Sequence, residues 1–513
     1  MKNKILNFFI CLVLISNVGC TDDLETTPLV ELSLEELLKQ DPNAIEGIVS
    51  RLYASFALSG VNGPGNSDIS DDAGESPFLR GIINLQDFTA DAMKNRWGDD
   101  GLDQLTTTSN WDENNKFFRY LFNRIYFTAP QCNNLLAIID NIDVENKESV
   151  IAEVRFLRAL AYYYLIDTFG KGVLATEDNF GNSTPLPESS RSEIFAYIES
   201  ELIAAEAALP ATNTYGRASK AAGQMLLAKL YMNAEVYTGT ARYDDALIYI
   251  KKVINESSYS LDPNFIQLFS ADNSTSSEII FPLIADANTS QSFGNTTYIV
   301  NGSLSSETLT LADFGATEGW AGHRASKGWY GLFGDLGTST DIRASLFWTD
   351  GHTYEMTDYR EWTNGYPSVK FRNTNFSGNS IATSFSSTDF PLFRLADTYL
   401  MYAECVLRGA SGGDMNTALQ YVNDVRTRSN ASEITTSQLT LSFIIDERGR
   451  ELNLEGHRRS DLIRFGMFTG GNYLWPWKGN TVDGTSIPST YSLFPVPLSA
   501  LQANPNLTQN PGY

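Results

Sequence analysis

The chain has 513 residues, of which 42% are hydrophobic and 12% aromatic, and it carries a formal net charge of −24 with a pI of about 4.5. This length is enough for a large hydrophobic core, or for about two or three domains of average size. A surface this acidic repels phosphate backbones and anionic lipid, which argues against nucleic-acid binding. Uncharged partners meet no such electrostatic penalty.

The N-terminus is typical of an export signal. Lys2 and Lys4 form a basic start, and residues 5–15 form an apolar run that is too short to span a membrane as a helix. We therefore expect residues 1–19 to be a signal peptide.

The residues that follow resemble a lipobox. Gly19 precedes Cys20, although Asn17 stands where leucine is common. Lipid on the Cys20 sulfur would anchor the chain by burying methylene groups in the bilayer. The acidic, core-free residues 20–28 are expected to be an extended tether.

The remaining cysteines and acidic loops give no clear metal site. Cys132 and Cys405 lie inside helical patterns far apart in the sequence, and we expect both to be buried apolar side chains. We expect no cofactor. Acidic loops such as those at Asp272 and Asp414 could contribute to a structural calcium site. Calcium needs six to eight oxygen ligands, however, and no loop of the sequence shows a pattern that would supply them.

Helical periodicity dominates long stretches of the sequence. Gly170 ends one of the expected helices, as a glycine in the left-handed conformation does. The expected helices cover residues 42–59, 114–141, 147–169, 191–209, 218–237, 243–256, 394–408, 415–429 and 438–465.

Two helix pairs repeat each other. Residues 231–235 precede Ala246, and residues 401–404 precede Ala418, with leucine and then tyrosine following each alanine. Small alanines at helix crossings, with larger side chains filling the groove, are typical of tetratricopeptide hairpins. The alternative is two unrelated amphipathic helix pairs.

The amino-acid composition changes outside these helices. Glycine, serine, threonine and asparagine dominate residues 261–393 and 468–513, which we interpret as loop-rich insertions on the helical scaffold. The helical repeats would cover about 29–260 and 394–467, within one mainly α domain from 29 to 513. All the tryptophans fall outside the expected helices, which favours aromatic rings displayed on loops: Trp97, Trp111, Trp320, Trp329, Trp348, Trp362, Trp475 and Trp477.

Four stretches resemble the RagB/SusD family. They are residues 153–170, 390–404, 447–466 and 494–513, and with the lipobox they cover nearly the whole chain. The resemblance implies an outer-membrane, cell-surface lipoprotein with four tetratricopeptide-like units. Such proteins cap a TonB-dependent, SusC-like transporter and deliver glycans to it.

The charged run from Arg448 to Arg464 looks catalytic at first glance. We interpret the run as structural, because the guanidinium groups of arginine form bidentate pairs with carboxylates and so hold helices together. His457 within it is expected at the surface.

Within the family, the sequence is most similar to the starch-binding member, in residues 72–80, 218–222, 234–239, 294–300, 319–320 and 460–479. That member holds helical malto-oligosaccharide in an arc of aromatic rings flanked by an arginine and an amide. By position, the residues that fall on these glycan-binding roles are Arg80, Trp97, Tyr298 and Trp320, with Asp99 or Asp100 at the amide. The neighbouring tryptophan of that member is Asn95 or absent here, which weakens the match of the Trp97 loop.

The chemistry of these residue types suits a sugar. A pyranose has an apolar C–H face that stacks on indole or phenol rings, while Arg80 supplies donors and an aspartate supplies acceptors. Gly319 and Gly322 flank Trp320 and permit an open turn. The alternative for each aromatic residue is core packing.

Three other functions compete with capture of α-glucan. An enzyme lacks support, since the chain has only three histidines and no metal or nucleophile motif, although paired carboxylates cannot be judged from sequence. A protein-interaction scaffold of the transporter is the second. The third is the same role for a β-glucan such as laminarin.

Overall fold

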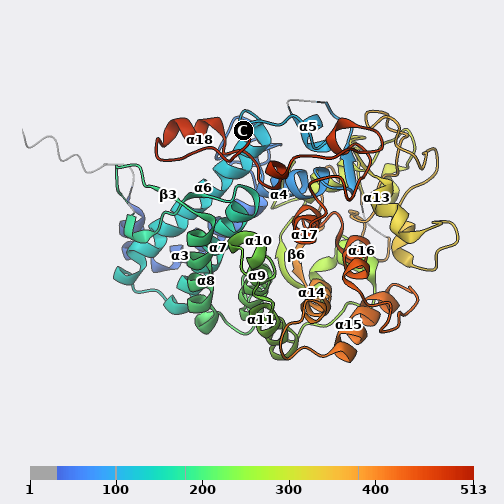
Figure 1. Ribbon diagram of the computed structural model, residues 1–513. Helices are drawn as coiled ribbons and strands as arrows, with labels where there is room; N and C mark the ends of the chain where they lie inside the picture. Colours follow the sequence, from blue (N-terminus) through green and yellow to red (C-terminus); the bar gives the residue numbers. More distant parts are fainter. Residues whose placement is uncertain (1–31, 99–100, 180, 379–380) are drawn as a thin grey trace, which may run out of the picture.

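The computed structural model describes residues 32–98, 101–179, 181–378 and 381–513. Helices dominate and the strands are short, so the expectation of a mainly α fold is confirmed (Figure 1). The expected signal peptide and tether, with Cys20, lie outside the described residues, as do Asp99 and Asp100. Across the described part of the chain, every helix is too short or too polar to pass through a lipid bilayer.

The first part of the scaffold consists of long helices with side-chain caps. Ser33 and Glu36 form a capping box at the start of α2, and Ser190 with Glu193 forms another on α8. These caps satisfy amide groups that a helix leaves unpaired at its start. The elements are α2 (Leu34–Gln40), η2 (Pro42–Ala44), α3 (Ile45–Ala57), α6 (Lys116–Ile138), η4 (Ile139–Asn141), α7 (Lys147–Thr168) and α8 (Arg191–Ala208).

The remaining scaffold helices form two groups in the sequence, which the large insertion separates. In Figure 1 they lie beside the first helices. The helix expected over 218–237 is two helices, because it breaks at Asn233. The elements are α9 (Lys220–Met232), α10 (Ala234–Thr238), α11 (Tyr243–Glu256), α14 (Leu395–Leu407), α15 (Met415–Arg428), α16 (Leu441–Leu452) and α17 (Arg458–Arg464).

The two repeated helix pairs form equivalent hairpins. Helix α9 packs on α11, α14 packs on α15, and α11 packs on α14, so the two hairpins stack. The alanine of each pair is fully buried. Tyr231 and Tyr249 contact each other across the first hairpin at 5.7 Å between ring centroids, and Tyr402 and Tyr421 across the second at 5.1 Å. This arrangement agrees with tetratricopeptide-type packing.

The prediction of one helix over residues 438–465 is wrong. This segment divides into α16 and α17 because Leu454 and Gly456 adopt positive φ angles of 66° and 74°. The N–H groups of both residues donate hydrogen bonds of 3.0 Å to the Asp87 carboxylate. A distant side chain therefore holds the break open.

The strands form three separate two-stranded antiparallel sheets. Strand β4, inside the large insertion, pairs with β6 at the end of the insertion, so the two strands enclose residues 284–389. Strand β1 pairs with β5, which joins the segment after α4 to the middle of the insertion. The strands are β1 (Met93–Asn95), β2 (Gly172–Val173), β3 (Glu188–Ser189), β4 (Ile279–Leu283), β5 (His323–Ala325) and β6 (Phe390–Arg394).

Short helical turns punctuate the loop-rich segments. Trp329 lies on one of them, where no helix was expected, and it is buried, so it is not one of the rings displayed on loops. The turns are α4 (Phe78–Ile82), the π-helix η3 (Ile83–Phe88), α5 (Leu102–Thr106), η5 (Glu177–Asn179), η6 (Phe265–Phe269), η7 (Asn273–Thr275), α12 (Thr296–Gly302), η8 (Leu311–Phe314), α13 (Lys327–Tyr330), η9 (Gly331–Phe333), η10 (Ile342–Leu346), η11 (Lys478–Asn480), η12 (Ser489–Ser492) and α18 (Leu498–Ala503).

One large hydrophobic cluster extends from Leu38 to Val496 and includes residues from the helical repeats and from the large insertion. Such shared burial couples the insertion to the scaffold, because exposing either part would expose apolar surface of the other. The division into one domain stays a prediction.

Candidate functional site

The β1–β5 pairing brings the two predicted loop tryptophans together. Asn95 and His323 are partners in this ladder, and Arg96 N donates to Gly322 O at 3.0 Å just beyond it. Trp97 follows β1 and Trp320 precedes β5, so the antiparallel register places them side by side. The Trp97 Nε1 atom donates to the Trp320 carbonyl oxygen at 3.2 Å.

The glycines around Trp320 allow close contacts as well as a turn. A Cβ atom on Gly322 would lie 2.5 Å from the Trp97 ring, and one on Gly319 would lie 2.8 Å from the Leu304 carbonyl oxygen. The backbone N–H of Trp320 donates to Asn301 O at 2.7 Å, at the end of α12. The Trp320 loop is therefore fastened to α12, and its indole is half-buried.

Tyr298 lies beneath this surface. Its side chain has no exposed area, and its hydroxyl donates to the Asn84 Oδ1 atom of the π-helix at 2.7 Å. Its ring lies 6.2 Å from that of Trp97. For Tyr298, the structure thus shows the core-packing alternative, and direct contact with a ligand stays a prediction that requires rearrangement of this layer.

Arg80 is also part of the supporting layer. Its guanidinium lies 4.3 Å above the Tyr298 ring, in a cation–π arrangement. Its Nη1 atom donates to Gly74 O at 3.2 Å and its Nη2 atom to Glu75 at 3.3 Å. Arg80 is buried, so its predicted contact with a glycan likewise stays a prediction.

A buried histidine completes the layer. The His323 ring lies 4.5 Å from that of Tyr298 and 5.4 Å from that of Trp97. Burial holds its pKa well below the usual value, and the positive charges of Arg80 and Arg324 lower it further. His323 is therefore neutral near pH 7 and gives the site no cationic acid.

Sequence reasoning missed Phe293. Its side chain is 37% exposed, and its ring lies 6.5 Å from Trp320 and 4.9 Å from Phe385. It extends the surface formed by the half-buried Trp97 and Trp320, and the three residues are called the aromatic patch below. The signal that could have revealed this residue was Gly294, because it follows Phe293 in the same way that glycines flank Trp320.

One polar group lies at the edge of the aromatic patch. Glu318 accepts a hydrogen bond of 3.3 Å from the Trp320 Nε1 atom, and its side chain is exposed. A carboxylate beside a ring can accept hydrogen bonds from hydroxyl groups of a ligand stacked on it. Glu318 was also missed, because acidic residues are common throughout the sequence.

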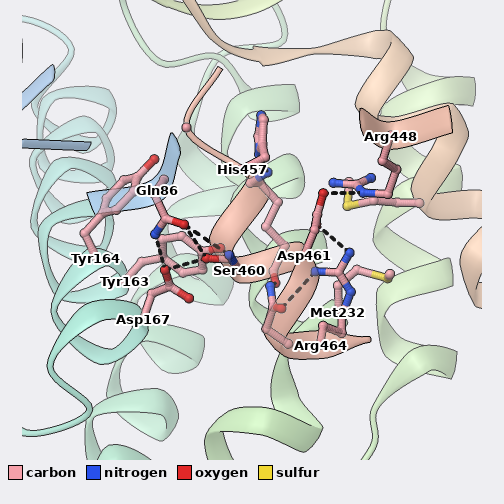
Figure 2. Close-up of a pocket in the computed structure, with 14 residues that line it drawn as sticks. Gln86, Tyr163, Tyr164, Asp167, Met232, Arg448, His457, Ser460, Asp461 and Arg464 are labelled. Carbon is pink, nitrogen blue, oxygen red and sulfur yellow. Dashed lines mark hydrogen bonds and ion pairs between the residues drawn. The ribbon is translucent and has the colours of Figure 1, made fainter. Parts of the chain in front are cut away.

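The charged run from Arg448 to Arg464 joins helices, as the structural interpretation expects (Figure 2). Arg448 bonds to Asp461 and to Asp397 of α14, each at 2.7 Å. Arg464 bonds to Glu404 of α14 at 2.8 Å. The side chains of all these residues are buried, and their ion pairs hold α14, α16 and α17 together.

His457 is buried, which corrects its expected surface position. Its Nδ1 atom lies 3.1 Å from the Lys229 ammonium, and burial lowers its pKa to about 3. The adjacent cavity, shown in Figure 2, has a volume of about 20 Å³ and is lined by side chains such as Gln86 and Ser460. That volume suits a water molecule and is too small for a sugar ring.

The described residues contain no cluster of three or more histidine, cysteine or acidic side chains that could hold a metal ion. Asp272 accepts a hydrogen bond from the Phe376 amide, and Asp414 caps α15. Both loop carboxylates thus serve the backbone. Cys132 and Cys405 are buried free thiols, as expected.

Comparison with known proteins decides the family. Residues 337–513 match the SusD family, and residues 78–232 match the family described as starch-binding associating with outer membrane. The chain is 32% identical to Starch-binding protein SusD of Bacteroides thetaiotaomicron, over the full length of both chains. The chain belongs to the SusD family. A SusD-like protein of Formosa agariphila is 26% identical, over 99% of this chain and 98% of that protein.

Solved structures of the SusD superfamily share the fold. A protein from Parabacteroides distasonis aligns with a TM-score of 0.72 and 21% identity, over 94% of this chain and 100% of that chain. Surface glycan-binding protein A of Bacteroides thetaiotaomicron, in complex with laminarihexaose, aligns with a TM-score of 0.70 and 21% identity, over 91% of this chain and 99% of that chain. The arrangement of helices and insertions is therefore that of SusD proteins.

Proposed function

We propose that this SusD-family protein captures a neutral α-glucan, such as starch or malto-oligosaccharide, on the aromatic patch without cleaving it. The observation that carries the proposal is the joining of Trp97 and Trp320 by the β1–β5 ladder into a partly exposed surface with Phe293. The full-length similarity to Starch-binding protein SusD supports α-glucan as the ligand.

The physical chemistry of the patch suits this ligand. Indole and phenyl faces bury the C–H face of a pyranose and lose little conformational entropy, because each ring is already fixed. Glu318 at the edge offers acceptors to sugar hydroxyls. A neutral ligand also approaches a protein of net charge −24 without repulsion.

The proposal extends to location and partner. Lipid on Cys20 would hold the protein on the outer membrane, and a TonB-dependent, SusC-like transporter would receive the glycan. The family described as associating with outer membrane supports this placement. His323 beneath the patch stays neutral near pH 7 and so offers no cationic acid to a bound sugar, which supports binding without hydrolysis.

A β-glucan is the second candidate ligand. It is favoured by the fold shared with the glycan-binding protein that is in complex with laminarihexaose. The curvature of the ring set separates the two, because a helical α-1,4 chain follows a curved surface and an extended chain follows a flatter one.

Affinity electrophoresis against neutral polysaccharides tests the proposal. Retardation by amylopectin or amylose, with no release of reducing ends, is expected. Retardation by laminarin alone would replace α-glucan with β-glucan. Binding to the transporter without retardation by any glycan would favour the interaction scaffold, and release of reducing ends would show an enzyme.

A further inference from the structure

A second hollow lies at the junction of α3, the turn after α8 and the end of β4. Its volume is about 390 Å³, within the range of small-ligand pockets, and its lining is mostly apolar. We call it the α3 pocket. Its lining includes Tyr53, Leu58, Tyr215, Phe281, Ile284 and Ser290.

The rings of the α3 pocket are fixed in place. The Tyr215 hydroxyl donates to Asp389 at 2.7 Å, and the Tyr53 hydroxyl donates to Glu153 at 2.6 Å. Tyr215 is nevertheless 39% exposed and Ile284 is 37% exposed. Both tyrosines therefore have their polar ends committed to the protein, and the exposed Tyr215 presents ring surface to the pocket.

The turn that carries Tyr215 is built to pack closely on β4. Gly216 has a φ angle of +86°, and a Cβ atom there would lie 2.3 Å from the Ile284 Cδ1 atom. A residue with a Cβ atom would be strained at this φ angle and would force the Ile284 side chain to move. The shape of the α3 pocket thus exists before any ligand arrives.

Two segments connect the α3 pocket with the aromatic patch. Ser290 lines the pocket and Phe293 belongs to the patch, and three residues of chain span at most about 11 Å. On the other side, Leu58 lines the pocket, and the segment after it reaches Gly74, where a Cβ atom would lie 3.8 Å from the Phe293 Cβ atom. The same two loops therefore border both features.

We infer that the α3 pocket is a distal subsite for the same glycan chain, occupied by sugar units beyond those stacked on the aromatic patch. This inference rests on the proposed function. The ring surface of Tyr215 would bury the apolar face of a pyranose, and the Ser50, Thr214 and Ser290 hydroxyls at the lining would bond to its rim. A short oligosaccharide would reach only the patch, and a longer one would fill both.

Titration calorimetry with a length series tests the inference. The probes are maltotriose and maltoheptaose, with laminaritriose and laminarihexaose in parallel. The variant Ala54→Phe fills the α3 pocket from α3 without removing a side-chain hydrogen bond, and Tyr215→Ala removes its most exposed ring. The matched control is Ala500→Phe, which fills a separate hollow of about 400 Å³ beside α18.

Wild-type protein should bind the long probe more tightly than the short one. Ala54→Phe should lower the affinity for the long probe about tenfold, which corresponds to about 1.4 kcal/mol, and leave the short probe unchanged. Tyr215→Ala should act in the same direction, and Ala500→Phe should change neither. A melting temperature close to that of wild type establishes that each variant is folded.

The inference is overturned if folded Ala54→Phe keeps the full affinity for the long probe, or if wild-type affinity is independent of length. It is also overturned if Ala54→Phe loses only transporter binding, because the pocket would then hold a protein side chain. Absence of binding by every glycan, at any length, would overturn the proposed function itself. If Trp320→Ala lost binding of the short probe while the affinity of the wild-type protein did not depend on glycan length, the proposed function would be retained and the distal subsite would be overturned.

Discussion

The indole N–H of Trp97 donates a hydrogen bond of 3.2 Å to the carbonyl oxygen of Trp320, although the two residues are 223 positions apart. The contact depends on the short β1–β5 ladder and on Gly322, which leaves room for the Trp97 ring. Two surface rings from distant segments are thereby fixed relative to each other. A preorganised pair of this kind loses little entropy when a ligand stacks on it.

Trp320→Ala should weaken binding of maltoheptaose by roughly 30-fold. A stacking aromatic at the centre of a small interface typically contributes about 2 kcal/mol, and each 1.4 kcal/mol changes affinity tenfold. Calorimetric titration measures the loss. Tyr421→Ala, which truncates a half-buried ring on α15, is the matched control and should leave affinity unchanged. Unchanged affinity for Trp320→Ala with a lower melting temperature would show that its indole serves packing.

Gly322→Ala should weaken glycan binding while leaving Trp320 in place. The added Cβ atom would lie 2.5 Å from the Trp97 ring, so the indole must move, at a cost of about 1–3 kcal/mol in stability. Affinity should fall about tenfold in the same titration. Gly47→Ala is the control, because its Cβ atom meets open space on α3 and should raise stability by about 0.5–1 kcal/mol. Native affinity in Gly322→Ala would argue against a binding role for the Trp97 position.

The helical hairpins could be predicted from sequence because their signal is local. Apolar residues recur at helical spacing, and alanine marks each crossing, as at Ala246 and Ala418. The break between α16 and α17 could not be predicted, since Asp87 creates it by accepting the Leu454 and Gly456 amides from far away in the sequence. Periodicity carries no information about such a distant acceptor.

The candidate site was predictable only in part for the same reason. The resemblance selected Trp97 and Trp320, and the β1–β5 register brings them together. It could not show that Tyr298 is buried, because that burial depends on Asn84 and on packing against Trp97. Exposure is a property of the whole fold, so an exposed ring such as Phe293 escaped notice.

Glu451→Ala should destabilise the protein by about 3–5 kcal/mol. The buried Glu451 carboxylate bonds to Arg343 of the insertion at 2.8 Å and to Arg394 at the start of α14 at 2.7 Å, and it also pairs with Arg428. Removing it leaves buried guanidinium groups without their shared partner. Urea unfolding measures the loss of free energy.

The matched control for this change is Glu35→Ala, which removes an exposed ion pair with Lys39. It should cost less than about 0.5 kcal/mol. Because Glu451 joins the insertion to the scaffold, calorimetry of wild-type protein should show one transition. Two separate transitions, of which Glu451→Ala shifts only one, would contradict the single domain.

Cys20→Ala should release the protein from membranes. Without the thiol no lipid can be attached, and the anchoring energy of about 0.8 kcal/mol for each buried methylene is lost. Fractionation of cells followed by detection of the protein in the soluble and membrane fractions measures the change. Cys132→Ala, at a buried free thiol, should leave the protein in the membrane fraction. Retention of Cys20→Ala with membranes would contradict the lipid anchor.

Lys94 should make stability rise with pH above neutrality. Its ammonium group is fully buried on β1 and donates to the Ala90 carbonyl oxygen at 2.7 Å, and burial lowers its pKa from 10.5 to about 7. Between pH 7 and 10.5 the unfolded chain therefore binds one proton more than the folded chain, so the free energy of unfolding increases with pH. The limit is about 1.4 kcal/mol for each pH unit.

Lys94→Met removes this titration and keeps an unbranched side chain. Urea unfolding at pH 7 and pH 9 should show that wild-type protein gains about 2 kcal/mol relative to Lys94→Met across this interval. Lys39→Met is the control, because Lys39 is exposed, and the stability difference between it and wild type should be the same at both pH values. A difference between wild type and Lys94→Met that does not change with pH would show that Lys94 stays charged in the folded protein, and that the carbonyl oxygens around its ammonium group solvate it as well as water does.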